Sequence, residues 1–178
     1  MLPRSAEDLA KKRRNSEHWN MLTWGQLGRS HDILAPYIIG SLHRKEFYSD
    51  VKNPHCDFGE NLANYHKYCL QNDLFLTHAL GDPQVDRSET AQNEDRKTSE
   101  DLEVVLHVVE ETKDGVIVTG GKQLSTAATH ANECYVSLSQ TFARRSDPKC
   151  VLAFSIPQGT PGLKALAREP ISRWHGSW

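Results

Sequence analysis

The chain has 178 residues, of which 38% are hydrophobic and 25% charged, a size that suits one domain or one domain with a small companion. Its 21 basic and 23 acidic residues give a net charge of -2, which argues against a nucleic-acid-binding surface because such a surface needs a clustered basic excess. No apolar run approaches the roughly 18 residues of a membrane span, and the first residues lack the apolar middle of a secretory signal. We therefore expect a soluble, cytoplasmic protein with reduced cysteines.

The first half of the chain is predicted to be helical. Ser5, followed three residues later by Asp8, has the pattern of a helix N-cap, and this helix is expected to continue to the glycines at 25 and 28. Its basic run 11–14 is interpreted as the solvated side of an amphipathic helix. A second helix is predicted over 33–42, with residues 43–57 as a loop. A third, ending near residue 72, is indicated by apolar residues at helical spacing: Phe58, Leu62, Tyr65 and Cys69.

The second half of the chain is predicted to form strands. A short strand over 74–77 precedes a turn at 81–83 and a polar excursion over 86–100. The segments 102–111 and 116–119 flank Lys113-Asp114-Gly115, which is a strong hairpin signal. Two further strands are expected over 134–142 and 150–156, each containing a core cysteine. Helices followed by strands predict an α+β protein with a segregated antiparallel sheet or barrel.

No metal site is expected. The candidate set is His55, Cys56, His66 and Cys69, but its spacing matches no common zinc finger. Cys69 also belongs to the apolar stripe of the third helix, so a structural role is favoured. Neither a dinucleotide fingerprint, nor a phosphate loop, nor a serine-hydrolase elbow occurs in the sequence.

Four stretches of the sequence indicate its family, which the hydrophobic periodicity does not. They are 27–30 (LGRS) with Asp32, 72–87 (NDLFLTHALGDPQVDR), the hairpin 110–122 (EETKDGVIVTGGK), and 123–128 (QLSTAA) with Asn132 and Glu133, the last taken as the strand that follows the hairpin. In this order they resemble segments of the family formed by the oxygenase component of 4-hydroxyphenylacetate 3-monooxygenase and its relatives. The resemblance runs from about Leu2 to the last residues.

This resemblance implies an acyl-CoA dehydrogenase-like architecture. Residues 1–73 would be an N-terminal helical domain truncated at its start, and residues 74–178 a middle β domain with a barrel-like antiparallel sheet. The family's C-terminal helical bundle, which builds a tetramer, would be absent. The implied activity is the hydroxylation of a phenol such as 4-hydroxyphenylacetate. It uses O₂ and reduced FAD from a separate flavin reductase, through a flavin C4a-hydroperoxide.

The resemblance also implies particular site residues. Arg29 and His78 would bind the phenolic oxygen and stabilise its anionic character, although by themselves they would be a surface arginine and a core histidine. Thr126 would donate its hydroxyl to the flavin ring; the alternative is an ordinary strand threonine. The remaining flavin contacts would be His78, Ala79, Leu80, Gln84, Val85, Asp86 and Arg87, and Ser139 and Gln140 would lie near the substrate.

One departure from the family pattern leaves alternatives open. Ile33 stands where the family's phenol hydroxylases have a tyrosine, which removes one hydroxyl that anchors the phenol. The alternatives are a relative that acts on another substrate, a non-catalytic remnant that keeps the fold, and a plain structural or binding module. The family's dehydratase branch is disfavoured, because no cysteine lies near residues 25–29 to hold its iron–sulfur cluster.

Overall fold

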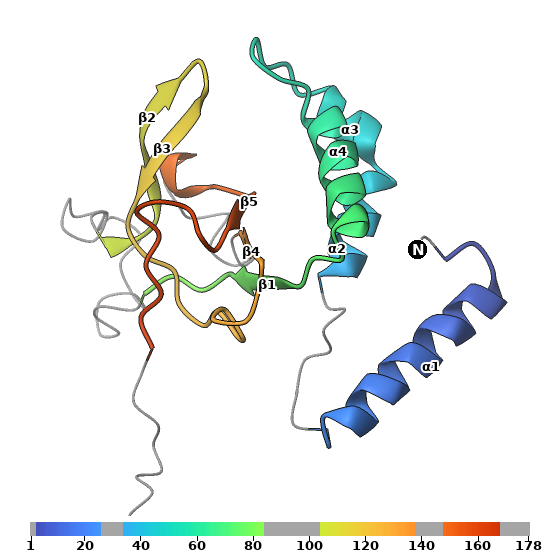
Figure 1. Ribbon diagram of the computed structural model, residues 1–178. Helices are drawn as coiled ribbons and strands as arrows, with labels where there is room; N and C mark the ends of the chain where they lie inside the picture. The colour runs from blue at the N-terminus through green and yellow to red at the C-terminus, as the bar shows by residue number, and fades with distance from the viewer. Residues whose placement is uncertain (1–2, 26–33, 84–103, 138–147, 168–178) are drawn as a thin grey trace, which may run out of the picture.

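The computed structural model describes residues 3–25, 34–83, 104–137 and 148–167 (Figure 1). Helices α2 (Ala35–Leu42), α3 (Lys45–Ser49) and α4 (Phe58–Gln71) form one group. The strands form a second group, joined to the first by the chain between α4 and the first strand, β1 (Leu76–Ala79). In the described portion of the chain, no helix is long and apolar enough to cross a membrane.

Helix α1 (Ala6–Leu22) begins as the sequence predicts. The Ser5 hydroxyl accepts a hydrogen bond from the Asp8 backbone N–H at 3.1 Å, and exposed ion pairs such as Lys11–Glu7, at 3.1 Å, lie along the helix. No residue of α1 is buried, however, and Met21 is 78% exposed. The basic residues are thus solvated, but the opposite side of α1 buries no apolar face within the described portion of the chain.

The predicted loop 43–57 is wrong in part, because it contains a helix. Helix α2 (Ala35–Leu42) is followed by α3 (Lys45–Ser49), which packs against α4 (Phe58–Gln71). A Cβ at Gly59 of α4 would lie 2.5 Å from the Lys45 carbonyl oxygen, so only glycine allows this close approach. A helix of five residues has too few turns for a periodic signal, and packing rather than intrinsic propensity stabilises it.

Asp57 joins α3 to the first turn of α4. Its carboxylate accepts hydrogen bonds from the backbone N–H groups of Gly59 (2.8 Å) and Glu60 (3.0 Å), and from the Ser49 hydroxyl (2.7 Å). The hydrogen bond from Ser49, followed by those from the backbone, holds the pKa of Asp57 below its usual value.

Replacing Asp57 with alanine is expected to lower the thermal unfolding midpoint by several degrees, because two N–H groups of α4 lose their acceptor. Since the pKa of Asp57 is lower in the folded than in the unfolded chain, its contribution is full above the ordinary carboxyl range. It is lost as the pH falls through the lowered value. Thermal melts of Asp57→Ala between neutral and acidic pH should therefore converge with those of the wild type. Asp50→Ala, which removes an exposed carboxylate after α3, is the control; equal losses in both variants would contradict the capping role.

The strands form a three-stranded sheet and a hairpin. The sheet has the order β1 (Leu76–Ala79), β4 (Glu133–Val136), β5 (Phe154–Pro157), and the hairpin pairs β2 (His107–Thr112) with β3 (Gly115–Thr119). The hairpin turn is where the sequence predicts it. β4 and β5 are antiparallel, but β1 and β4 pair in parallel, which differs from the purely antiparallel expectation. A parallel pair needs a long connection, and here that connection contains the hairpin.

The hydrophobic core is built around the three-stranded sheet. Ala79, Leu106, Cys134 and Val136 are buried together, with Phe154 and Ile156 of β5 packed against them. Cys150 is buried as well, but in a short 3₁₀-helix, η1 (Pro148–Cys150), and not in a strand as predicted. The turn that begins at Pro148 includes Cys150, so the extended run that the apolar pattern indicates starts later, at Phe154.

Candidate functional site

The site residues predicted from the sequence divide into two groups. His78, Ala79, Leu80 and Thr126 belong to the described portion of the chain. The others lie outside the described residues: Arg29, Gln84, Val85, Asp86, Arg87, Ser139, Gln140, and Ile33 with them. The described site therefore consists of β1 and the segment that carries Thr126.

Strand β1 carries the predicted catalytic histidine into the protein interior. Thr77, His78 and Ala79 are 3%, 5% and 6% exposed, so both faces of this strand are covered. Along one edge β1 pairs with β4, where His78 stands opposite Tyr135. Leu80, just beyond the strand, is half-buried. An imidazole at the buried end of a strand is held in one place with little access for water, which suits a group that binds a reacting oxygen.

The segment 122–126 lies beside β1 and the residues that follow it. Three contacts join this segment to residues 77–82 in antiparallel order: the Thr77 hydroxyl donates to the Thr126 carbonyl, the Gln123 N–H donates to the Gly81 carbonyl at 2.8 Å, and the Lys122 ammonium donates to Asp82. We call these two stretches, 77–82 and 122–126, the paired segments. They bring together all four predicted flavin residues that the structure describes.

Thr126 lies in a turn, so the predicted strand over 123–128 and the interpretation of Thr126 as an ordinary strand residue are both wrong. The turn follows from the backbone, since Leu124 and Ala127 have φ angles of 64° and 60°, values incompatible with a regular strand. The turn is exposed at Thr126. It returns to β1 at Asn132, whose side-chain oxygen accepts from the Phe75 N–H at 2.8 Å and whose N–H donates to the Phe75 carbonyl at 2.8 Å.

Four polar residues that sequence reasoning did not select therefore support this site: Thr77, Asp82, Lys122 and Asn132. Each lies inside one of the stretches that carry the family resemblance. A signal was thus present, but the sequence alone does not show which partners they contact across about fifty residues of chain.

Cys134 lies on β4, close to the turn that carries Thr126. Its sulfur is 3.9 Å from the Ser125 hydroxyl, and burial raises the pKa of the thiol. A buried thiol with a raised pKa holds little of the reactive thiolate near neutral pH.

We expect iodoacetamide to label Cys134 at least about tenfold more slowly than Cys56 at pH 8, because Cys134 is 6% exposed whereas Cys56 is only half-buried. Peptide mass spectrometry over a time course measures both rates in one sample. In urea the two rates should converge. Equal rates in the folded chain would show that β4 is not buried as described.

Tyr65, in the apolar stripe of α4, lies near Glu133 of β4 and Ser155 of β5. Burial raises the pKa of the Tyr65 hydroxyl, and the neighbouring Glu133 carboxylate raises it further although Ser155 acts in the opposite direction. Burial likewise raises the pKa of Cys69. Both side chains therefore stay neutral at physiological pH, in keeping with a packing role for the stripe.

No metal-binding cluster occurs among the residues that the structure describes. In those ranges no three His, Cys, Asp or Glu side chains come together in a way that could hold an ion. His55, Cys56, His66 and Cys69 all belong to the described ranges, so they do not form such a group.

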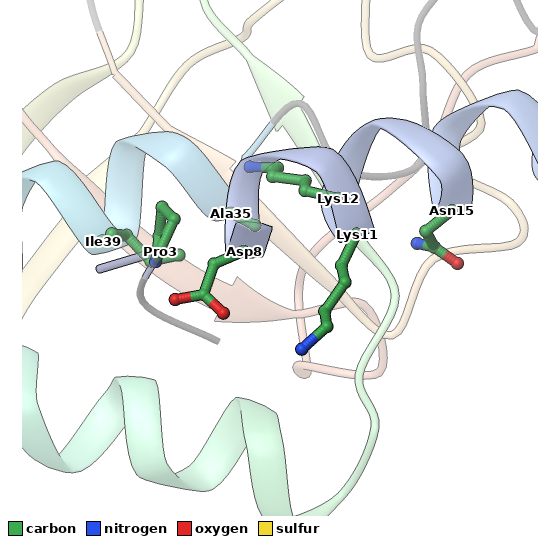
Figure 2. Close-up of a pocket in the computed structure, with 7 residues that line it drawn as sticks. All are labelled: Pro3, Asp8, Lys11, Lys12, Asn15, Ala35 and Ile39. Atoms are coloured by element: carbon green, nitrogen blue, oxygen red, sulfur yellow. The ribbon is translucent and has the colours of Figure 1, made fainter. Parts of the chain in front are cut away.

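A pocket lies between α1 and α2 (Figure 2). It is lined by Pro3, Asp8, Lys11, Lys12, Asn15, Ala35 and Ile39. Asp8 accepts from the Arg4 N–H at 2.9 Å, and Lys11 pairs with Glu7, so these polar groups serve the start of α1. Among the site residues that the structure describes (His78, Ala79, Leu80 and Thr126), none lines this pocket.

The fold places the chain in a known class. It matches the crystal structure of an oxygenase component of 4-hydroxyphenylacetate 3-monooxygenase complexed with FAD and 4-hydroxyphenylacetate, with a TM-score of 0.75 and 28% identity, over 91% of this chain and 31% of that one. The architecture is thus acyl-CoA dehydrogenase-like, as the resemblance implied. A 4-hydroxybutyryl-CoA dehydratase from N. maritimus, 21% identical with a TM-score of 0.63, shares the fold.

Within this class, the family model described as 4-hydroxyphenylacetate 3-hydroxylase N terminal matches residues 1–177. The chain belongs to this family, which confirms the resemblance found in its sequence.

Individual relatives agree with this assignment. The chain is 31% identical, over 99% of its own length and 34% of the relative's, to the oxygenase component of 4-hydroxyphenylacetate 3-monooxygenase from Geobacillus sp. (strain PA-9). It is 32% identical, over 93% of its length and 28% of the relative's, to the oxygenase component of 4-nitrophenol 2-monooxygenase from Rhodococcus sp.. The chain thus spans about a third of the length of the curated relatives it matches.

Proposed function

We propose that this chain supplies the reduced-FAD and phenol contacts of a two-component aromatic monooxygenase. The observation that carries the proposal is the pairing of segments 77–82 and 122–126, which gathers His78, Ala79, Leu80 and Thr126 in a chain that matches the family over 1–177. The helical residues 1–73 and the strand-forming residues 74–178 would be the family's first two domains.

The described residues fit a flavin at this place. A flavin ring needs an apolar, water-poor surface with a few fixed polar groups. The buried end of β1 offers Ala79 and the half-buried Leu80, and the adjacent turn exposes Thr126. Bound reduced FAD would supply the activation of O₂. Outside the described residues, Gln84, Val85, Asp86 and Arg87 would add contacts to it.

The residues of the chain would orient the phenol and exclude water. His78, 5% exposed, would hold the phenolic oxygen and stabilise negative charge that develops on it, together with Arg29. Ser139 and Gln140 would line the substrate side. Reduced FAD would come from a separate flavin reductase, and the assembled enzyme would be a cytoplasmic homo-oligomer, a tetramer by family resemblance.

The proposal is tested by titrating the purified chain with FAD, first oxidised and then reduced under anaerobic conditions, with calorimetry as the readout. We expect saturable binding that is at least about tenfold tighter for the reduced form, equivalent to about 1.4 kcal/mol. Circular dichroism establishes that the chain is folded in the same buffer. A folded chain that binds neither form would contradict the proposal and favour the non-catalytic alternative.

A second candidate is a relative that acts on something other than a phenol. The observation that favours it is Ile33, which replaces the family's tyrosine. In that case the chain would bind reduced FAD, but 4-hydroxyphenylacetate would produce no further heat in the same titration. Ile33→Tyr should then introduce phenol binding if the missing hydroxyl is the cause.

A further inference from the structure

A buried ion pair joins the paired segments at their outer end. The side chains of Lys122 and Asp82 are 6% and 11% exposed. By contrast, the pair between Lys45 and Glu60 is on the surface, with side chains 38% and 58% exposed. Removing two charges from water is costly, so a buried pair is weak evidence for stability, and its best-attested use is to specify one arrangement over its neighbours.

The ion pair lies where the arrangement of the two segments is decided. The contacts Thr77–Thr126, Gly81–Gln123 and Asp82–Lys122 keep one antiparallel order along the paired segments, yet only Gly81 and Gln123 form a β-bridge. A regular β-ladder would fix the register by many backbone hydrogen bonds, whereas the paired segments have few. A shift by one residue would turn side chains to the opposite face. Lys122 and Asp82 contact each other in the register observed, and their opposite charges favour that register.

We propose that Lys122 is a positioning residue for the flavin site. By pairing with Asp82 it fixes the segment that carries Thr126 relative to His78, Ala79 and Leu80 on the facing segment. Lys122 itself need not contact the flavin. The inference rests on the proposed function, because the paired segments matter for catalysis only if they hold reduced FAD.

The experiment compares Lys122→Met, Lys122→Arg and Asp82→Asn in the full chain. The readouts are the affinity for reduced FAD and the free energy of unfolding in urea. We expect Lys122→Met and Asp82→Asn each to weaken reduced-FAD binding at least tenfold, while Lys122→Arg, which keeps the charge, stays within threefold of wild type. Lys45→Met, which breaks the exposed pair with Glu60, is the matched control and should bind FAD normally.

A single variant leaves one buried charge without its partner and could therefore fail to fold. The double variant Asp82→Asn with Lys122→Met removes both charges, so it tests the proposal without that problem. It should fold and bind FAD no more weakly than the single variants, because the two residues act through one contact. Variants that lose stability but keep wild-type FAD affinity when folded would overturn the positioning role.

Amide hydrogen exchange separates this inference from the proposed function. The Gln123 N–H, bound to the Gly81 carbonyl, should lose at least tenfold of its protection in Lys122→Met, while amides of the β2–β3 hairpin keep theirs. If the wild-type chain binds no FAD, the proposed function fails, and with it the role of Lys122 at a flavin site. Unchanged Gln123 protection would overturn the positioning by Lys122 whatever the flavin result.

Discussion

Replacing His78 with alanine is expected to reduce the product formed per reduced flavin oxidised by about 100-fold. The imidazole is 5% exposed at the end of β1, where a phenolic oxygen that gains negative charge would otherwise meet an apolar strand end. On the proposed function, the reduced flavin would still consume oxygen without that group, but the phenol would no longer be held or polarised. Flavin oxidation should then continue without product.

The measurement needs a form of the protein extended to the length of its relatives, with O₂ consumption and hydroxylated product followed in the same reaction. His130→Ala is the control, because His130 is exposed in the turn 126–130 and should leave coupling unchanged. His78→Asn, which keeps a hydrogen-bond donor, should recover some of the coupling. If His78→Ala couples as well as the wild type, His78 has no role in the mechanism.

The sequence predicts those elements of this fold that local chemistry determines. The N-cap at Ser5, the stripe of α4 and the hairpin turn at Lys113-Asp114-Gly115 each depend on residues within a few positions of one another. The fold class and the family also followed from the sequence, because four long stretches occur in the right order.

What the sequence could not predict depends on contacts between distant residues. Helix α3 exists because Gly59 admits the Lys45 carbonyl, and a five-residue helix has no period of its own. The parallel pairing of β1 with β4 and the turn at Thr126 are set by partners far along the chain, such as Asn132 with Phe75. In the candidate site, His78 and Thr126 were selected by resemblance, whereas Thr77 and Lys122, which contact the same two segments, became visible only in the structure.

Replacing Gly120 with alanine is expected to lower the free energy of unfolding by about 3 kcal/mol or more. Gly120 has a φ of 102°, which L-residues rarely adopt. An added Cβ would lie 2.3 Å from the Val105 carbonyl oxygen and 2.8 Å from the Leu106 nitrogen. Both atoms are backbone, so no side chain can rotate away to relieve the contact. The chain segment that moves would carry Leu106, a buried member of the core just before β2.

Alanine substitutions at two other glycines, measured by urea denaturation, distinguish backbone strain from the close contact as the cause of the lost stability. Gly115→Ala introduces an unfavourable φ of 150° with nothing within 4 Å of the new Cβ, so it measures backbone strain alone. Gly40→Ala, inside α2 and also in open space, should raise stability by up to about 1 kcal/mol. If Gly120→Ala lowered the free energy of unfolding no more than Gly115→Ala, the close approach to Val105 would be disproved.

Gly120 directly precedes Gly121 and Lys122 in the chain. Gly120→Ala should therefore also disturb the paired segments and weaken reduced-FAD binding, whereas Gly115→Ala should not.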